Sequence, residues 1–294
     1  MYGQLGSSAA AAVPYTFPAA GMSDSSGVSA GGFHTCSFRT HGTTSPDEMF
    51  CWGLNSNRQL GDGTNMNQLF PKIVIIPDSR IKSITNGSDH TCMLSKTGHV
   101  WCWGSNDSWQ AGGDTLTLMQ NIKQVETIGS SVTAISAGDF HTCVLTVLGE
   151  VKCWGHNQHG QLGDGTTTGR YTAKPVLGLG SNVIAISSGR ESTCALLSSL
   201  DPHANRVFCW GDNSSGQIGD GTTVDRLVPT PVAGSNIDDA IVISAGGFHA
   251  CAMKTDMRVA CWGENTSGQI GDNTVVNKTT PTIASGFPPP PDPE

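Results

Sequence analysis

The chain has 294 residues and an acidic balance, with 24 Asp and Glu against 16 Lys and Arg and a formal net charge of −8. This balance argues against a nucleic-acid-binding protein and against docking on an anionic membrane, because both tasks need an excess of basic residues. The longest apolar runs are short pieces such as residues 73–76, far below the roughly 18 residues of a membrane-spanning helix, so we expect no membrane insertion.

The first segment, residues 1–21, has neither the basic n-region nor the apolar h-region of a secretory signal peptide. It contains YGQLG and TFPAAG, which match the last part of a repeat unit that recurs along the rest of the chain. We therefore interpret residues 2–20 as the rear half of a unit whose front half is absent. A half unit leaves strand edges unpaired, so we expect either that the sequence is part of a longer polypeptide or that this half unit packs as an incomplete sixth blade.

A complete unit then recurs five times, near residues 28–77, 84–128, 135–179, 186–235 and 243–286. Each unit has a first marker related to AGGFHTC, then Cys-Trp-Gly, then a third marker related to GQLGDGT. The tryptophans are spaced by 51, 51, 56 and 52 residues, at Trp52, Trp103, Trp154, Trp210 and Trp262. Self-similarity at this period indicates stacked supersecondary units.

Each unit is typical of short strands separated by turns. Segments such as VTAIS and IVIS are rich in β-branched residues, and TCVLTVLGEVKCWG is two such runs around a turn, which predicts a hairpin. Asp-Gly pairs such as Asp62-Gly63 supply positive-φ residues for tight turns. About four strands in roughly 50 residues is the content of a β-propeller blade.

The combined pattern, ISAGxxHTCxL followed by CWGxNxxGQLGDGT and PxxV, resembles the repeats of the regulator-of-chromosome-condensation family over about residues 28–285. The resemblance implies a β-propeller of four-stranded blades, usually seven in the best-known members, whereas this chain has five full units. We therefore expect an all-β fold, a β-propeller of five complete units plus an N-terminal half unit, as a single domain over residues 1–286. Residues 287–294 form a proline-rich tail of polyproline II type.

The ten cysteines fall two to a unit, with none left over. Their separation within a unit is 10 or 15 residues, and the extra residues in the longer cases, such as SLDPHANR, are typical of an insertion at a hairpin tip. The two cysteines of a unit can therefore remain opposite each other on paired strands. We predict the disulfides Cys36–Cys51, Cys92–Cys102, Cys143–Cys153, Cys194–Cys209 and Cys251–Cys261.

A zinc site is the alternative for these cysteines, because His34, His90, His141 and His249 each lie two residues before a Cys. The fourth unit has Ser192 in place of the His and keeps both cysteines, which favours disulfides. We expect these histidines to hydrogen-bond neighbouring backbone groups, and we expect no bound metal and no cofactor. Five disulfides indicate an oxidising compartment, extracellular or at the cell surface.

Glycosylation sequons occur at Asn86, Asn106, Asn213, Asn265 and Asn277. The alternative is that the Asn after Cys-Trp-Gly caps a turn through its side chain, because Asn55 and Asn157 hold the same place without a sequon. The Asp of GDGT could suggest calcium, but one carboxylate beside glycines is far from a calcium ligand set.

Every polar motif recurs with the repeat, whereas catalysis needs one asymmetric site, so we expect no enzymatic activity. We interpret the chain as a secreted or cell-surface structural or adhesive propeller. Its expected partners are other extracellular proteins or copies of itself, and it could be a module of a larger extracellular assembly. The alternatives are a secreted protein inhibitor of an enzyme, resembling the β-lactamase-inhibitory propellers, and a carbohydrate-binding or enzymatic propeller.

Binding residues concentrate on loops that a rigid scaffold positions. The loops that vary between units are residues 40–49, 109–114 and 199–206. Their candidate binding residues are His41, Asp47, Glu48, Trp109, Asp201, His203 and Arg206.

Overall fold

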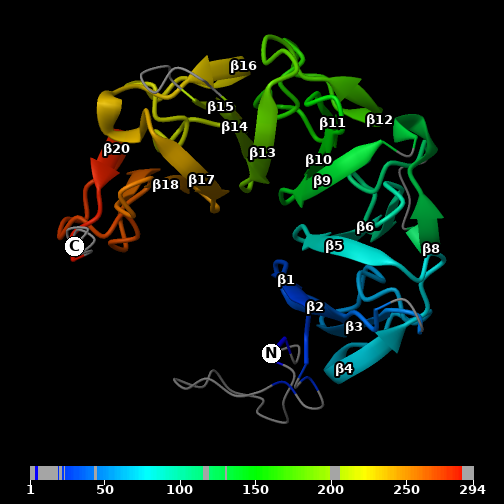
Figure 1. Ribbon diagram of the computed structural model, residues 1–294. Helices are drawn as coiled ribbons and strands as arrows, with labels where there is room; N and C mark the ends of the chain where they lie inside the picture. Colours follow the sequence, from blue (N-terminus) through cyan, green and yellow to red (C-terminus); the bar gives the residue numbers. More distant parts are fainter. Residues whose placement is uncertain are drawn as a thin grey trace. The chain divides into compact units, whose positions relative to one another are not determined.

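The structure is a computed structural model that describes residues 4–5, 19, 22, 24–42, 45–114, 119–129, 131–198 and 206–286 (Figure 1). The chain divides into two compact units, Met1–Thr142 with Arg170–Ala173, and Cys143–Gly169 with Lys174–Glu294. The boundary between them falls inside the third repeat, and the expectation of one domain over residues 1–286 stays a prediction. The proline-rich tail, residues 287–294, lies outside the described residues.

The described strands form five four-stranded sheets, one for each complete repeat, and the strands of a sheet are neighbours in chain order. The first sheet contains β1 (Gly27–Ala30), β2 (His34–Arg39), β3 (Glu48–Gly53) and β4 (Gln68–Val74), and the second contains β5 (Ile81–Asn86), β6 (His90–Ser95), β7 (Val100–Gly104) and β8 (Met119–Gln124). The third contains β9 (Val132–Ala137), β10 (His141–Thr146), β11 (Val151–Gly155) and β12 (Arg170–Pro175). The fourth contains β13 (Val183–Ser188), β14 (Ser192–Leu197), β15 (Val207–Gly211) and β16 (Arg226–Pro231), and the fifth contains β17 (Ala240–Ala245), β18 (His249–Lys254), β19 (Val259–Gly263) and β20 (Lys278–Ile283).

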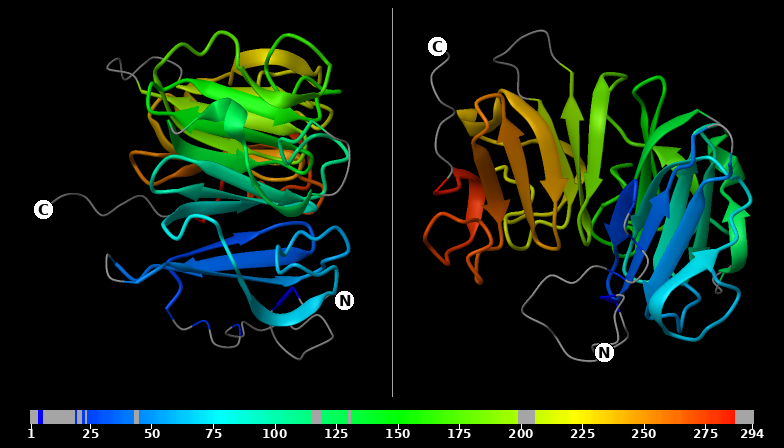
Figure 2. Two further views of the ribbon diagram at one scale, coloured as in Figure 1. Left: turned by 90° about the vertical axis from the view of Figure 1, so that its right-hand side faces the viewer. Right: turned by 60° about the horizontal axis from the view of Figure 1, so that its bottom comes forward.

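Helical structure among the described residues is limited to two 3₁₀ turns, η1 (Glu126–Ile128) and η2 (Ser235–Ile237). Neither turn has the length and apolar character that a membrane-spanning helix requires. The four strands of the first sheet run side by side in blue to cyan in Figure 2. The expected all-β class with one four-stranded sheet per repeat is therefore confirmed.

The cysteines of each repeat lie on the second and third strands and form a disulfide. In the first sheet Cys36 on β2 is the direct cross-strand partner of Cys51 on β3, and the same register relates Cys194 to Cys209. The pairs are those that the spacing predicts: Cys36–Cys51, Cys92–Cys102, Cys143–Cys153, Cys194–Cys209 and Cys251–Cys261. No cysteine remains free for the zinc site considered above.

The tryptophan of Cys-Trp-Gly joins its repeat to the repeat before it. Trp103 is 1% exposed, and its indole N–H donates to the backbone carbonyl of Gln59 at 3.0 Å. The Thr91 hydroxyl on β6 donates to the same oxygen at 2.8 Å. In the second unit Trp210 and Trp262 donate in the same way to Gln161 and Gln217. The glutamine loop of one repeat is therefore an acceptor for the next, which explains why the second and third markers recur together.

The histidine of HTC makes a further bond within the first unit. His34 Nε2 lies 2.9 Å from the Thr91 hydroxyl, and His90 Nε2 lies 3.0 Å from the Thr142 hydroxyl. Because each threonine already donates its proton to a glutamine carbonyl, the histidine must be the donor to it. The expected partner, a neighbouring backbone group, was therefore wrong: the partner is a side chain of the following repeat.

Two departures from the repeat sequence have a common explanation in this contact. The fourth repeat has Ser192 where the others have His, and the fifth repeat has Ala250 where the others have Thr. These are the two positions that would bond across the fourth and fifth repeats. Both partners are missing together, so neither side is left with an unpaired polar group at that place.

The asparagine after Cys-Trp-Gly organises the loop that follows it. Asn213 is fully buried, and its Nδ2 lies 3.0 Å from the carbonyl of Val224 and 3.2 Å from that of Thr222. Its Oδ1 accepts the backbone N–H of Ile218 at 2.9 Å. Asn265 makes the equivalent bonds, and Asn106 is buried with its Nδ2 donating to Gly113.

This burial decides between the two interpretations of the sequons. A glycan on Nδ2 of Asn106, Asn213 or Asn265 has no place in the folded chain, so the turn-capping interpretation applies there. Asn86 is 7% exposed and donates its Nδ2 to the carbonyl of Ser29. Asn277 is the sequon asparagine with an exposed side chain, so glycosylation remains a prediction at Asn277.

The described part of the N-terminal segment repeats the glutamine contact. The backbone carbonyl of Gln4 accepts the indole N–H of Trp52 at 2.9 Å and the hydroxyl of Thr35 at 3.1 Å. Gln4 therefore does for the first repeat what Gln59 does for the second. Most of residues 2–20 lie outside the described residues, and the expectation of an incomplete sixth blade or a longer polypeptide stays a prediction.

Candidate protein-binding surface

The fourth strand of the first sheet exposes an unusual amount of apolar surface. Strand β4 ends the sheet, so one of its edges has no strand partner within that sheet. Large apolar side chains on and just after it are substantially exposed: Leu69 by 49%, Phe70 by 48%, Ile73 by 46% and Ile75 by 81%. Contiguous exposed apolar surface of this kind is typical of binding sites.

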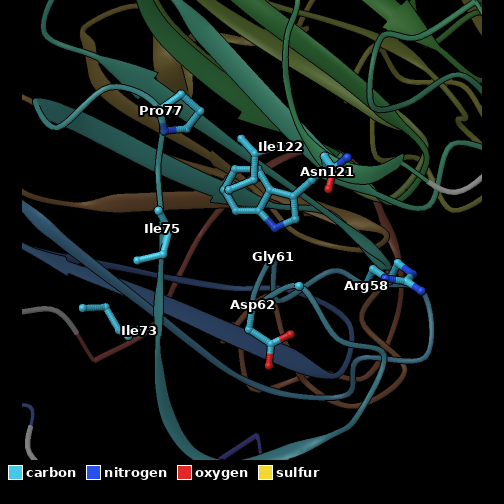
Figure 3. Close-up of a pocket in the computed structure, with 10 residues that line it drawn as sticks. Arg58, Gly61, Asp62, Ile73, Ile75, Pro77, Asn121 and Ile122 are labelled. Carbon is cyan, nitrogen blue, oxygen red and sulfur yellow. The ribbon is translucent and has the colours of Figure 1, made fainter.

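A groove of about 350 Å³ adjoins this strand. Ile73, Ile75 and Pro77 line one side, and Asn121 and Ile122 from β8 line the other (Figure 3). The remaining lining residues are Arg58, Gly61, Asp62, Gly63 and Trp103. The groove thus combines apolar walls with a few polar groups, which is the composition expected of a recognition site.

The backbone after the fourth strand explains why a groove is present here. In the third, fourth and fifth repeats, the second residue after this strand donates its N–H to the carbonyl of the glycine that lies two residues after the loop glutamine: Leu177 to Gly163 at 3.0 Å, Ala233 to Gly219 at 2.9 Å and Ser285 to Gly271 at 2.7 Å. Ile75 is the equivalent of these residues. Among the described residues of the first repeat, no such bond joins Ile75 to Gly61, so the chain after β4 is not tied down over the loop.

The base of the groove is fixed by the tryptophan contact. Gly61 has a φ of 68°, and a Cβ at this position would lie 2.6 Å from the indole nitrogen of Trp103. Only glycine satisfies both the left-handed backbone and the close approach. Arg58 also has a positive φ, 60°, where three of the other repeats have glycine. An arginine at this strained position adds a cation to the groove.

Asp62 places a carboxylate on the same wall. Burial raises the pKa of this carboxyl, but hydrogen bonds from Thr64, Asn55 and Gln68 outweigh it and hold the pKa below its usual value. Gln68 Nε2 donates to Asp62 Oδ2 at 2.8 Å. The groove therefore presents a fixed negative charge whose hydrogen-bond donors are neutral groups. The Arg58 guanidinium also lines the groove.

The loops favoured by the sequence have mixed outcomes. Asp47 is 4% exposed and accepts the backbone N–H of Ile81 at 2.9 Å and that of His41 at 3.1 Å. It therefore holds two segments together and exposes little side-chain surface, and its role in binding stays a prediction. His41 lies 3.2 Å from Glu48 as an exposed ion pair, and both remain accessible.

The other two loops carry less surface. Trp109 is half-buried with a φ of 64°, and Arg206 donates its Nε to the carbonyl of Leu197 at 3.0 Å. Asp201 and His203 lie outside the described residues. The groove beside β4 was not predicted, because it lies outside the loops that vary between repeats. The available signal was the run QLFPKIVI, which is more apolar than the matching segments RYTAKPVL, RLVPTPVA and KTTPTIAS.

Comparison with known proteins places these features in context. The family description "RCC1-like domain" matches residues 1–291. The Ultraviolet-B receptor UVR8 of Arabidopsis thaliana is 29% identical over 243 residues, which cover 82% of this chain and 54% of the receptor. The human E3 ubiquitin-protein ligase HERC2 is 28% identical over 88% of this chain but 5% of the ligase. The chain thus spans about half the length of the first relative and a small part of the second.

Two solved structures share the fold. Human WBSCR16 has a TM-score of 0.77 at 21% identity, covering 88% of this chain and 66% of that chain. Prp20p of Saccharomyces cerevisiae, whose structure was described together with its binding to Gsp1p and histones, has a TM-score of 0.72 at 19% identity. The match covers 87% of this chain and 62% of Prp20p. These likenesses show the fold.

Proposed function

Because the chain belongs to the family of RCC1-like domains, we propose that it is a non-catalytic β-propeller domain that binds another protein through the groove beside β4. The observation that carries the proposal is the exposed apolar strand with its open groove, at one of the two described repeats, the first and the second, where no backbone bond ties the chain after the fourth strand to the glutamine loop. The Prp20p structure supports a protein-binding role for this fold, since that relative binds Gsp1p and histones.

The partner that fits the groove is a protein segment with apolar side chains. Ile73, Ile75 and Pro77 provide an apolar wall, and β4 is an outer strand of its sheet. Pro71 lacks a backbone N–H and interrupts that edge. The partner is therefore held mainly by side-chain burial, with Arg58 and Asp62 setting its orientation by charge.

We place this binding outside the cell or at its surface. Five disulfides account for every cysteine, and such bonds persist in oxidising compartments. A structural or adhesive role in an extracellular assembly is the function we infer from the two observations together.

The experiment uses one variant in the groove and one matched control. Ile75→Lys places a charge on the apolar wall, and Val275→Lys places the same charge on a residue that is also exposed, by 65%. We expect wild type and Val275→Lys to capture the same protein from extracellular material of the producing organism, and Ile75→Lys to lose it. Equal thermal unfolding of the three proteins controls for folding. Retention of the partner by Ile75→Lys would reject the groove as the binding site.

A further inference from the structure

A cluster of histidines and carboxylates lies within the second unit, between the third and fourth repeats. His159 follows β11, Glu191 lies between β13 and β14, Asp212 follows β15, and Asp225 precedes β16. His159 Nδ1 is 2.8 Å from Asp225 Oδ2, and His159 Nε2 is 3.3 Å from Glu191 Oε2. Side-chain ligand atoms of His159, Asp212 and Asp225 all lie within 4.8 Å of one another.

The cluster breaks the repeat pattern. His159 stands where the other repeats have Asn57, Ser108, Ser215 and Ser267. Glu191 stands where three of the other repeats have phenylalanine. A second histidine, His156, also occurs in this repeat alone, with Nδ1 3.5 Å from Glu191 Oε1. The repeat architecture does not require these side chains, because the other repeats form their sheets without them.

Neutral groups hold the carboxylates in place and leave oxygens for another ligand. Asp225 Oδ1 accepts the backbone N–H of Asn213 at 2.9 Å, while its Oδ2 faces His159. Asp212 is 4% exposed, and it accepts the side-chain N–H of Gln217 at 2.7 Å and the backbone N–H of Ser214 at 3.0 Å. These donors are neutral, and buried carboxylates are usually paired with a cation or coordinate a metal.

Backbone contacts also hold His159 in place. Its N–H donates to the side-chain oxygen of Gln161 at 3.0 Å. The next residue, Gly160, has a φ of 79°, and a Cβ there would lie 2.7 Å from the Cα of Leu227. The loop of the third repeat therefore lies directly against the start of β16, so the imidazole is held beside Asp225.

The charges of the cluster do not balance. Three carboxylates, Glu191, Asp212 and Asp225, lie around the His159 ring, with Asp225 at one ring nitrogen and Glu191 at the other. Arg190 contributes positive charge to Glu191 from nearby. Several carboxylates around one imidazole favour a cation with a higher charge than a proton as their ligand.

We propose that His159, Asp212 and Asp225 form a binding site for a divalent transition-metal ion, with zinc as the representative ion. Imidazole nitrogen and carboxylate oxygen are ligands of zinc at about 2.0–2.2 Å. Glu191 accepts the N–H of the His159 nitrogen that does not bind the ion, which orients the ring, as carboxylates commonly do behind a metal-bound histidine. The ion takes the place of the proton on the other ring nitrogen.

This site differs from the zinc site considered for the cysteines. All ten cysteines form disulfides, so no thiolate competes for the ion. Its three ligands come from two consecutive repeats of the second unit, and a bound ion joins the third repeat's loop to the ends of β15 and β16. The expectation that the chain binds no metal is revised by this proposal.

The test is isothermal titration calorimetry with zinc alone. It uses tag-free protein that has first been dialysed against a chelator. We expect one zinc ion per chain. His159→Asn and Asp225→Asn should each weaken binding by about tenfold or more. The matched control is His41→Asn, because His41 forms an exposed pair with Glu48 without a third ligand nearby; it should change the affinity by less than about twofold.

A second measurement keeps the test valid if a variant fails to fold. Cobalt added to the wild-type protein should give the visible absorption of a four- or five-coordinate site, and zinc should displace it. Absence of zinc binding by the wild type, or unchanged binding in both His159→Asn and Asp225→Asn, would overturn the proposal. Calcium binding as tight as zinc binding would overturn the assignment to a transition metal.

Discussion

The contact between the first and second repeats differs from the contact between the fourth and fifth repeats at both ends, although the same tryptophan bond forms the middle of each. At the first contact, His34 bonds to Thr91, and the chain after β4 is free of the glutamine loop. At the other, Ser192 and Ala250 make no such pair, and Ala233 is tied to Gly219. The first contact therefore has a His–Thr hydrogen bond and no tether beside the groove, whereas the other lacks that hydrogen bond and has the tether.

This difference shows that the tryptophan bond between repeats is constant, whereas the His–Thr bond and the tether after the fourth strand can vary. Trp103 donates to Gln59, and Trp262 donates to Gln217, with nearly equal distances of 3.0 and 2.9 Å. The positions on either side can change as long as buried polar groups keep partners or disappear in pairs. A binding groove can then arise at one repeat without loss of the fold.

The largest expected effect concerns acid stability at the first contact. Burial lowers the pKa of both His34 and His90 to about 3. Between about pH 6.5 and pH 3 the unfolded chain binds protons that the folded chain does not, so stability falls as pH decreases through this range. Each pKa unit corresponds to about 1.4 kcal/mol.

Urea unfolding as a function of pH measures this loss. His90→Gln should show a shallower decline of the unfolding free energy between about pH 6.5 and pH 4 than wild type. The control is His99→Gln, which removes a half-buried histidine outside the repeat contact, and the wild-type decline should persist in it. Parallel curves for all three proteins would contradict the assignment of buried, neutral histidines.

The next effect compares the two tryptophan bonds. The carbonyl of Gln59 also accepts from Thr91, whereas Ala250 offers no hydroxyl to Gln217. Trp262→Phe therefore leaves a carbonyl without its side-chain donor and should cost about 1–3 kcal/mol beyond the packing change. Trp103→Phe leaves Thr91 in place and should cost less. Denaturant midpoints compare them, and an equal or larger loss in Trp103→Phe would contradict this account.

A smaller effect tests whether the missing His–Thr pair can be restored. The double variant Ser192→His with Ala250→Thr should recreate the bond seen between His34 and Thr91. We expect a favourable coupling free energy of about 0.5–1.5 kcal/mol in a double-mutant cycle with the two single variants. A coupling of zero would show that the fourth and fifth repeats pack differently from the first and second.

The smallest effect concerns the charge beside the groove. Asp220 pairs with Arg226 at the fourth repeat, whereas the equivalent Asp62 accepts from the neutral Gln68. Gln68→Arg should stabilise the first repeat by at most about 1 kcal/mol, and Arg226→Gln should destabilise the fourth by a similar amount. Thermal unfolding at low and high salt checks both, since the difference should shrink with salt.

The sequence predicted what the repeat itself determines. Recurring Cys-Trp-Gly with equal cysteine numbers was sufficient for the sheets and the disulfide pairs, because Cys36 and Cys51 are direct cross-strand neighbours. It did not predict the partner of His34, which lies 57 residues along the chain on the next sheet. Contacts between repeats depend on how sheets pack, and one repeat read alone does not contain that information.

The two candidate sites were missed for related reasons. The groove depends on a single backbone bond, the one that Ile75 does not make to Gly61, and residue types do not encode a missing N–H bond directly. The His159 cluster joins residues 66 positions apart, as His159 and Asp225 are. A position-by-position comparison of the five repeats would have marked His156 and His159 as departures, because no other repeat has a histidine at either position.

The most direct test of the protein-binding account is site-specific photo-crosslinking. A photoreactive side chain at position 75 lies on the wall of the groove, and one at position 275 is comparably exposed but belongs to the fifth repeat. In extracellular material from the producing organism, the account predicts a defined crosslinked protein from position 75 and none from position 275. The same crosslinked protein from both positions, or from position 275 alone, would contradict it.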